Sequence, residues 1–135
     1  MEIKTYRHEV KYYETDAMGV THHSNYIRIM EESRIDWLDQ VGYGYDKMEE
    51  EGIVSPVVAV TCDYKKPTKF KDVIEVTLGV AELSKLKLVL NYTMRCNGQI
   101  VCKATSTHCF FLEGRPIVLE EKLPGFFAVL QEMMQ

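Results

Sequence analysis

The alternation of apolar and polar residues along the chain first predicts one long helix. Between residues 24 and 40 apolar side chains recur every three or four positions, which is typical of an amphipathic helix. One stripe of this helix holds Tyr26, Met30, Ser33, Trp37 and Val41. Gly42 follows and can adopt the left-handed conformation that ends a helix.

Most of the remaining chain has strand-like patterns. Five segments predict β-strands: residues 3–13, 57–64, 73–82, 86–96 and 99–112. The segment 57–64 begins with an unbroken apolar run, which favours a strand buried on both faces. Asn97-Gly98 is a strong signal for a type I′ hairpin between the last two strands.

The order of these elements predicts the fold class. A strand, a long helix and four further strands indicate an α+β domain, in which a five-stranded antiparallel sheet wraps around the helix. A last helix is expected over residues 123–134, opened by Pro124, with Phe127, Leu130 and Met134 on its apolar stripe. We expect residues 1–135 to form one domain. The uncovered face of the sheet is expected to be apolar, which predicts a homo-oligomer.

Composition narrows the classes of function. A net charge of −4 argues against nucleic acid as a partner. No apolar run approaches the roughly 20 residues of a membrane span, and the N-terminus lacks the pattern of a signal peptide, so we expect a cytoplasmic protein. The four cysteines form no Cys-x-x-Cys pair, which favours buried free thiols over a zinc or redox site.

Chemistry-bearing residues concentrate in the turn before the long helix. Within residues 13–26 lie Asp16, Gly19, His22, His23 and Asn25. A helix start carries free N–H groups and partial positive charge, so an Asp beside it could activate water while those groups hold an oxyanion. The alternative is a structural Asp that caps the helix or accepts from loop amides.

The two adjacent histidines raise the question of a metal. We expect none, because neighbouring side chains diverge and no Asp, Glu or Cys lies at ligand spacing. His23 is expected to position the substrate or a water, and His22 to line the pocket. Gly19, Val20 and Tyr26 are further candidates for contact with the substrate.

The segment Tyr13-Glu14-Thr15-Asp16-Ala17-Met18-Gly19-Val20-Thr21-His22-His23-Ser24-Asn25-Tyr26 resembles the signature loop of hotdog-fold acyl-CoA thioesterases. The likeness is to the branch that contains 4-hydroxybenzoyl-CoA thioesterase (4HBT) and the Tol–Pal-associated acyl-CoA thioesterases. It extends to Trp37-Leu38, to the connection Pro67…Asp72 and to the Asn97-Gly98 hairpin. The resemblance implies a hotdog fold with active sites at dimer interfaces.

The resemblance also implies roles for single residues. It places the catalytic carboxylate on Asp16 and the amide that polarises the thioester carbonyl near His23. Two further sets are expected to bind substrate: Val57, Val58 and Ala59 around the acyl group, and Ser84, Lys85 and Lys87 around the phosphates of coenzyme A. The three apolar residues have an equally good interpretation as core. His22 and Met18 depart from the family pattern, so the acyl group stays open.

The expected function is therefore hydrolysis of an acyl-CoA thioester, or of an acyl group on a carrier protein, by a dimer or tetramer without cofactor or metal. Whether Asp16 acts as general base or as nucleophile is left open. One alternative is a hotdog dehydratase, which would favour a carboxylate on the facing helix, whereas Glu31 and Glu32 are expected to face outward. The other is a non-catalytic module that binds acyl-CoA or an acyl carrier.

Overall fold

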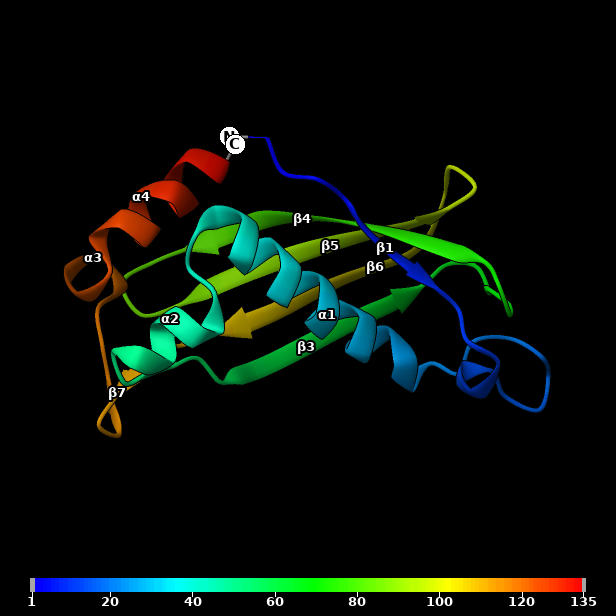
Figure 1. Cartoon of the computed structure of the whole chain (residues 1–135), viewed down its shortest axis with the longest axis horizontal. Helices are drawn as coiled ribbons and strands as arrows, with labels where there is room; N and C mark the ends of the chain where they lie inside the picture. The colour runs from blue at the N-terminus through cyan, green and yellow to red at the C-terminus, as the bar shows by residue number, and fades with distance from the viewer. Residues whose placement is uncertain (1, 135) are drawn as a thin grey trace.

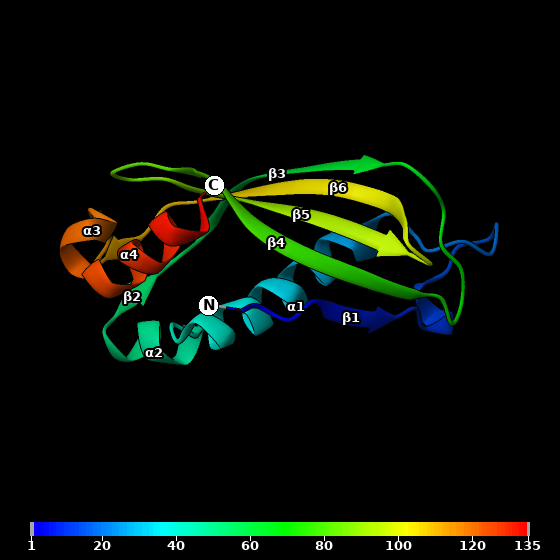
Figure 2. The ribbon, with the colours of Figure 1, turned by 90° about the horizontal axis from the view of Figure 1, so that it is seen from above.

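A single antiparallel sheet curves over one long helix (Figures 1 and 2) in a computed structural model that describes residues 2–134. The sheet has five strands in the order β1-β4-β5-β6-β3. Their bounds are β1 (Tyr6–Glu9), β3 (Val57–Tyr64), β4 (Val73–Leu83), β5 (Leu88–Cys96) and β6 (Gln99–His108). The predicted α+β fold with a five-stranded antiparallel sheet is confirmed, and β1 lies at one edge of the sheet.

The long helix α1 (Ser24–Val41) lies across one face of this sheet (Figure 2). All five residues of the predicted stripe are buried, and Ser33 is 0% exposed where the helix approaches the sheet. Gly42 ends the helix with φ 87°, a left-handed conformation that glycine adopts without steric cost. The apolar period of the sequence therefore determined both the extent and the orientation of α1.

Shorter elements cover the end of the sheet away from the turn of residues 14–22 (Figure 1). They are α2 (Tyr45–Glu50), β2 (Ile53–Val54), β7 (Phe111–Leu112), β8 (Arg115–Pro116), α3 (Leu119–Lys122) and α4 (Pro124–Met133). Of these, β2, β7 and β8 form a second small sheet. The short 3-10 turn η1 (Tyr12–Glu14) lies at the opposite end, beside the turn of residues 14–22. The helix α4 begins at Pro124 as predicted. Of its predicted apolar stripe, Leu130 is buried, Phe127 is only half-buried and Met134 is exposed, and Phe126 is buried as well.

Two predicted strands are too long. The first strand ends at Glu9, because the chain turns into η1, where the Glu14 carboxylate accepts the Lys11 N–H at 2.7 Å. The last strand ends at His108, after which Phe110 is 3% exposed in the core and β7 pairs with β2. At the hairpin, Asn97 (φ 52°) and Gly98 (φ 78°) both have positive φ, as a type I′ turn requires.

The predicted burial of the 57–64 strand is wrong. β3 is an edge strand that pairs only with β6, and seven of its eight residues are exposed. Its apolar side chains are largely uncovered by the described residues: Val57 is 42%, Val58 54% and Val60 38% exposed. The outer face of the sheet also differs from the expectation, because its central positions are mostly polar: Thr77, Asn91, Thr93, Lys103 and Thr105. The exposed apolar surface therefore lies along β3.

A buried polar network crosses the core beneath α1. We call it the Arg34 chain: Arg34, Tyr45, Tyr92, Ser106 and His108. The Arg34 guanidinium donates to the hydroxyls of Tyr45 and Tyr92, both at 3.0 Å. The Tyr92 hydroxyl lies 2.5 Å from Ser106 Oγ, which lies 2.8 Å from His108 Nε2. His108 Nδ1 is buried without a hydrogen-bond partner in the described chain.

The structure also tests the predictions made for the cysteines and for membrane-spanning segments. The cysteines are free thiols; Cys96 and Cys102 are buried, whereas Cys62 and Cys109 are half-buried. The predicted strand of residues 99–112 includes Cys109, whereas in the structure Cys109 lies just after the end of β6. Within residues 2–134, no helix combines the length and the apolar character needed to cross a bilayer.

Candidate active site

The turn between η1 and α1 is a closed loop with Asp16 at its base. Thr15 and Thr21 pair as an isolated antiparallel bridge. Inside this bridge, the Asp16 N–H donates to the Val20 carbonyl at 2.8 Å, and the Gly19 N–H donates to the Asp16 carbonyl at 2.9 Å. Gly19 has φ 82°, which explains a glycine at the tip of the loop. The loop therefore holds the backbone of Asp16 in one place.

The carboxylate of Asp16 is oriented by the same loop. Its Oδ1 accepts hydrogen bonds from the backbone N–H groups of Met18 at 2.9 Å and Val20 at 3.3 Å. Its Oδ2 accepts no hydrogen bond from residues 2–134. Asp16 thus does accept hydrogen bonds from loop amides, as a structural Asp in a turn would. It uses only Oδ1 for this, and Oδ2 stays available to a water or a substrate.

The start of α1 offers one free amide. The Ser24 N–H donates to His22 Nδ1 at 3.2 Å, the Asn25 N–H to the His22 carbonyl at 3.0 Å, and the Tyr26 N–H to the His23 carbonyl at 3.2 Å. The backbone N–H of His23 has no acceptor within the described chain. Because the helix dipole adds positive charge here, the His23 amide is the natural donor to an anionic oxygen.

Aromatic and polar contacts tie the loop and the helix start to the segment after β3. The Thr21 N–H donates to the Thr68 carbonyl at 2.8 Å, and the Tyr26 hydroxyl lies 2.9 Å from Thr68 Oγ1. The Tyr64 hydroxyl donates to the His23 carbonyl at 3.3 Å. Burial, with a smaller contribution from Cys62, raises the pKa of Tyr64 to about 12, so this hydroxyl remains a donor at neutral pH.

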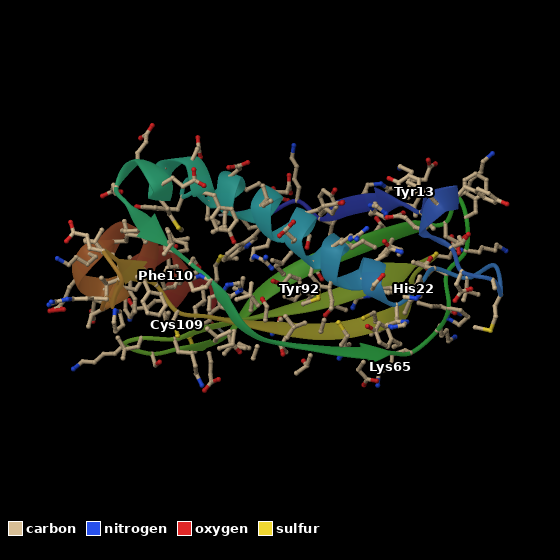
Figure 3. All side chains as sticks on the ribbon, turned by 90° about the horizontal axis from the view of Figure 1, so that it is seen from below. Tyr13, His22, Lys65, Tyr92, Cys109 and Phe110 are labelled. Atoms are coloured by element: carbon tan, nitrogen blue, oxygen red, sulfur yellow. The ribbon has the colours of Figure 1, made fainter. Side chains whose placement is uncertain are left out.

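These segments enclose a cleft of about 330 Å³. Its lining residues are Asp16, Met18, Val20, Thr21, His23, Tyr26, Tyr64, Lys65, Lys66 and Pro67. Figure 3 shows His22 and Lys65 at this end of the molecule, far from Cys109 and Phe110 at the other. The rings of Tyr26 and Tyr64 meet edge to face, with centroids 5.3 Å apart, and form an aromatic wall. A carboxylate and a free amide on one cleft are the parts that acyl transfer to water requires.

Comparison with known proteins assigns the chain to a family. A model of the thioesterase-like superfamily matches residues 10–124. The chain belongs to this superfamily. Several relatives are named thioesterases or thioester hydrolases, and the protein is a hydrolase of the hotdog fold.

Three similar proteins illustrate the relationship. A DHNA-CoA thioesterase from Staphylococcus aureus superposes with a TM-score of 0.89 at 28% identity, over 96% of this chain and 89% of that one. A hypothetical protein from Aquifex aeolicus superposes with a TM-score of 0.85 at 36% identity, over 96% and 98% of the two chains. The Haemophilus influenzae acyl-CoA thioesterase YbgC is 27% identical over 97 residues, 71% of each chain.

The structure brings part of the predicted thioesterase site together. Asp16, Val20, His23 and Tyr26 line the cleft, and Gly19 lies at the tip of the same loop. His22 does not line it, although its ring stacks on that of His23 with centroids 4.2 Å apart. The expectation that these two side chains diverge is therefore wrong, since the two ring planes are only 26° apart.

The other predicted substrate contacts lie outside the cleft of the same chain. Val57, Val58 and Ala59 are at the far end of β3, where Val57 lines a separate groove with Met30 and Arg34. Ser84, Lys85 and Lys87 form the turn after β4, which starts near the cleft and runs for eleven residues, on the order of 30 Å. Within one chain these six residues cannot reach Asp16, and their roles stay a prediction.

Six residues of the cleft were not among the predicted contacts: Met18 and Thr21 of the loop, and Tyr64, Lys65, Lys66 and Pro67. The last four lie at the end of β3 and just after it, and they reach the loop through tertiary contacts that no local pattern reports. The basic and proline-broken character of 65–72 was a signal that this segment is a connection. Sequence alone gave no reason to join it to Asp16.

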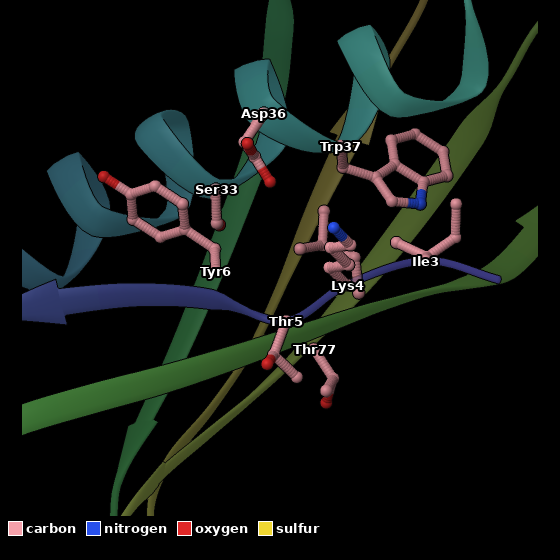
Figure 4. Close-up of a pocket in the computed structure, with 9 residues that line it drawn as sticks. Ile3, Lys4, Thr5, Tyr6, Ser33, Asp36, Trp37 and Thr77 are labelled. Atoms are coloured by element: carbon pink, nitrogen blue, oxygen red, sulfur yellow. The ribbon is translucent and has the colours of Figure 1, made fainter.

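A second cavity, of about 170 Å³, lies at the β1 edge of the sheet (Figure 4). Ser33, Asp36 and Trp37 of α1 line it together with residues of the N-terminal segment and β4. The Asp36 carboxylate accepts from Gln40 Nε2 at 2.7 Å, and Ser33 Oγ donates to the Met30 carbonyl at 2.9 Å. Its main polar groups are thus already paired, so the cleft at Asp16 is the better candidate.

Proposed function

We propose that this protein hydrolyses an acyl-CoA thioester to a carboxylic acid and coenzyme A at the cleft of Asp16. The observation that carries the proposal is a half-buried carboxylate with one oxygen anchored and one free, on the same cleft as the free amide of His23. The names of the relatives support a CoA thioester as substrate.

The chemistry follows from these two groups. Asp16 either takes a proton from the water that attacks the thioester carbonyl, or attacks that carbon itself and forms an anhydride that water then cleaves. In both routes the carbonyl oxygen becomes negative, and the His23 N–H stabilises it. The carbon–sulfur bond then breaks, and coenzyme A leaves as a thiolate.

The test is thiol release from short, long and aromatic acyl-CoAs, and from the same acyl groups on a carrier protein. Asp16→Asn keeps the hydrogen bonds to Met18 and Val20 but removes the base, so turnover should fall about 100-fold or more. Asp46→Asn, at an exposed Asp in α2, is the matched control. Unchanged turnover in Asp16→Asn would exclude Asp16 from the mechanism. Binding of acyl-CoA by the wild type without turnover would favour the binding module.

We further propose that the active form is a dimer in which the β3 strands of two chains pair. The free backbone edge of β3 and the exposed Val57, Val58 and Val60 support this, since such an edge invites a strand of another chain. In sedimentation experiments, Val58→Lys should give a monomer, whereas Thr77→Lys on the polar face should not. A wild type that sediments as a monomer would contradict the proposal.

A further inference from the structure

Glu14 is a buried carboxylate two residues before Asp16. It is 5% exposed, and its Oε1 accepts from the Lys11 N–H at 2.7 Å and lies 2.8 Å from His8 Nε2. Burial of a carboxylate is costly unless charged or hydrogen-bonding groups surround it. Glu14 therefore has a fixed position, held by β1 and the short η1 turn.

His8 extends this contact to the helix. Its second ring nitrogen, Nδ1, lies 3.2 Å from Glu32 Oε1, and the Tyr6 hydroxyl donates to that oxygen at 2.8 Å. A carboxylate oxygen thus lies within hydrogen-bond distance of each ring nitrogen of His8. We call Tyr6, His8, Glu14 and Glu32 the His8 bridge. It joins β1, the loop and α1.

The backbone of Glu14 contacts the start of α1, which carries the His23 amide. Its carbonyl accepts the His22 N–H at 2.8 Å and the side-chain amide of Asn25 at 2.9 Å. Asn25 is 5% exposed, so this contact is also buried. These two donors lie on either side of His23, whose amide is free. The backbone carbonyl of Glu14 is thus hydrogen-bonded to the start of α1, while the side chain of Glu14 is held by the His8 bridge.

We propose that Glu14 and His8 are positioning residues, which fix the Asp16 loop relative to the His23 amide. This inference rests on the proposed function. Neither residue lines the cleft, so both act through the backbone of the loop and the helix start. Geometry matters here because a displacement of about 1 Å between reacting groups can cost on the order of 100-fold in rate.

The experiment compares Glu14→Gln and His8→Gln with Arg7→Gln. Arg7 is the neighbouring residue of β1, and its exposed ion pair with Glu75 at 2.7 Å does not touch the loop. We expect kcat to fall about 10-fold or more in both bridge variants, with KM within about twofold of the wild type. Arg7→Gln should retain both constants. The double variant should be no slower than the slower single variant, because the two residues act as one unit.

Hydrogen exchange of the amides of residues 15–24 gives a readout that does not depend on activity. The bridge variants should exchange faster in this segment, with the strands of the sheet unchanged, and Arg7→Gln should match the wild type. A lower thermal midpoint with wild-type kcat and wild-type exchange in the loop would overturn the inference. An inactive wild type would refute the proposed function instead, and faster loop exchange in the variants would still support the positioning role.

Discussion

Two buried hydrogen-bond networks contact α1, and they differ in their charges. The His8 bridge contains two carboxylates around one imidazole, next to the loop of Asp16. The Arg34 chain contains Arg34, a residue that is 6% exposed, and no salt bridge joins Arg34 to a carboxylate within the described residues. Its partners are hydroxyl groups, followed by His108.

The two networks differ in role as well: the His8 bridge positions a loop, whereas the Arg34 chain supports the core. Contacts between one imidazole and two carboxylates connect the separate segments β1, η1 and α1 at the open end of the molecule, where a carboxylate can be partly hydrated: the Glu32 side chain is 44% exposed. The Arg34 chain lies between α1 and the middle strands, where hydroxyls pair without a second charge. The two histidines therefore differ in their hydrogen bonds. Both ring nitrogens of His8 have a partner, whereas His108 has one at Nε2 and none at Nδ1 within the described chain.

The largest expected effect concerns His108 and acid. Burial, and to a smaller extent the charge of Arg34, lower the pKa of His108 from 6.5 to about 4. The unfolded chain therefore binds a proton below pH 6.5 that the folded chain refuses until pH 4. The free energy of unfolding should fall over this range, by about 3 kcal/mol from His108 alone.

Urea unfolding at pH 7, 5.5 and 4 measures this effect. His108→Gln removes the titrating group and keeps a polar contact to Ser106. On acidification, the free energy of unfolding of this variant should fall by about 3 kcal/mol less than that of the wild type. Carboxylates add their own acid dependence to both proteins, so the difference between the two curves is the relevant quantity. Parallel curves would show that His108 is not buried in its neutral form.

The comparison also shows which features the sequence could reveal. The stripe of α1 and the loop of Asp16 were predicted because a periodic pattern and a short motif are local. The bridge was not, because His8 and Glu32 are 24 positions apart and only the fold places them together. For the same reason Tyr64 and Lys66 were missed in the cleft. The burial of β3 was misjudged because an apolar strand does not state whether its own chain or another one covers it.

A smaller effect is expected when the Arg34 chain is cut in its middle. Tyr92→Phe removes the acceptor of an Arg34 hydrogen bond and a partner of Ser106. The loss should be about 2 kcal/mol of unfolding free energy, since hydrogen bonds to charged groups are worth about 1.5–3 kcal/mol. Turnover per folded molecule should stay at the wild-type value, because Tyr92 does not line the cleft and its hydrogen-bond partners, Arg34 and Ser106, lie outside the Asp16 loop. A large fall in kcat with intact stability would reverse the roles assigned to the two networks.

The smallest effect should come from the exposed end of the His8 bridge. Glu32→Gln keeps an acceptor for the Tyr6 hydroxyl and for His8 Nδ1 but removes a charge that water partly screens. We expect a loss of 0.5–1 kcal/mol or less of unfolding free energy, about the value of a partly exposed ion pair. The fall in kcat should be smaller than in Glu14→Gln, because Glu32 has no contact with the loop itself.

The two networks can be compared by measuring kcat and the free energy of unfolding for both variants. Glu32→Gln should lower kcat more than Tyr92→Phe does, and Tyr92→Phe should lower the free energy of unfolding more than Glu32→Gln does. Equal ratios of the two effects would mean that both networks serve only to stabilise the fold.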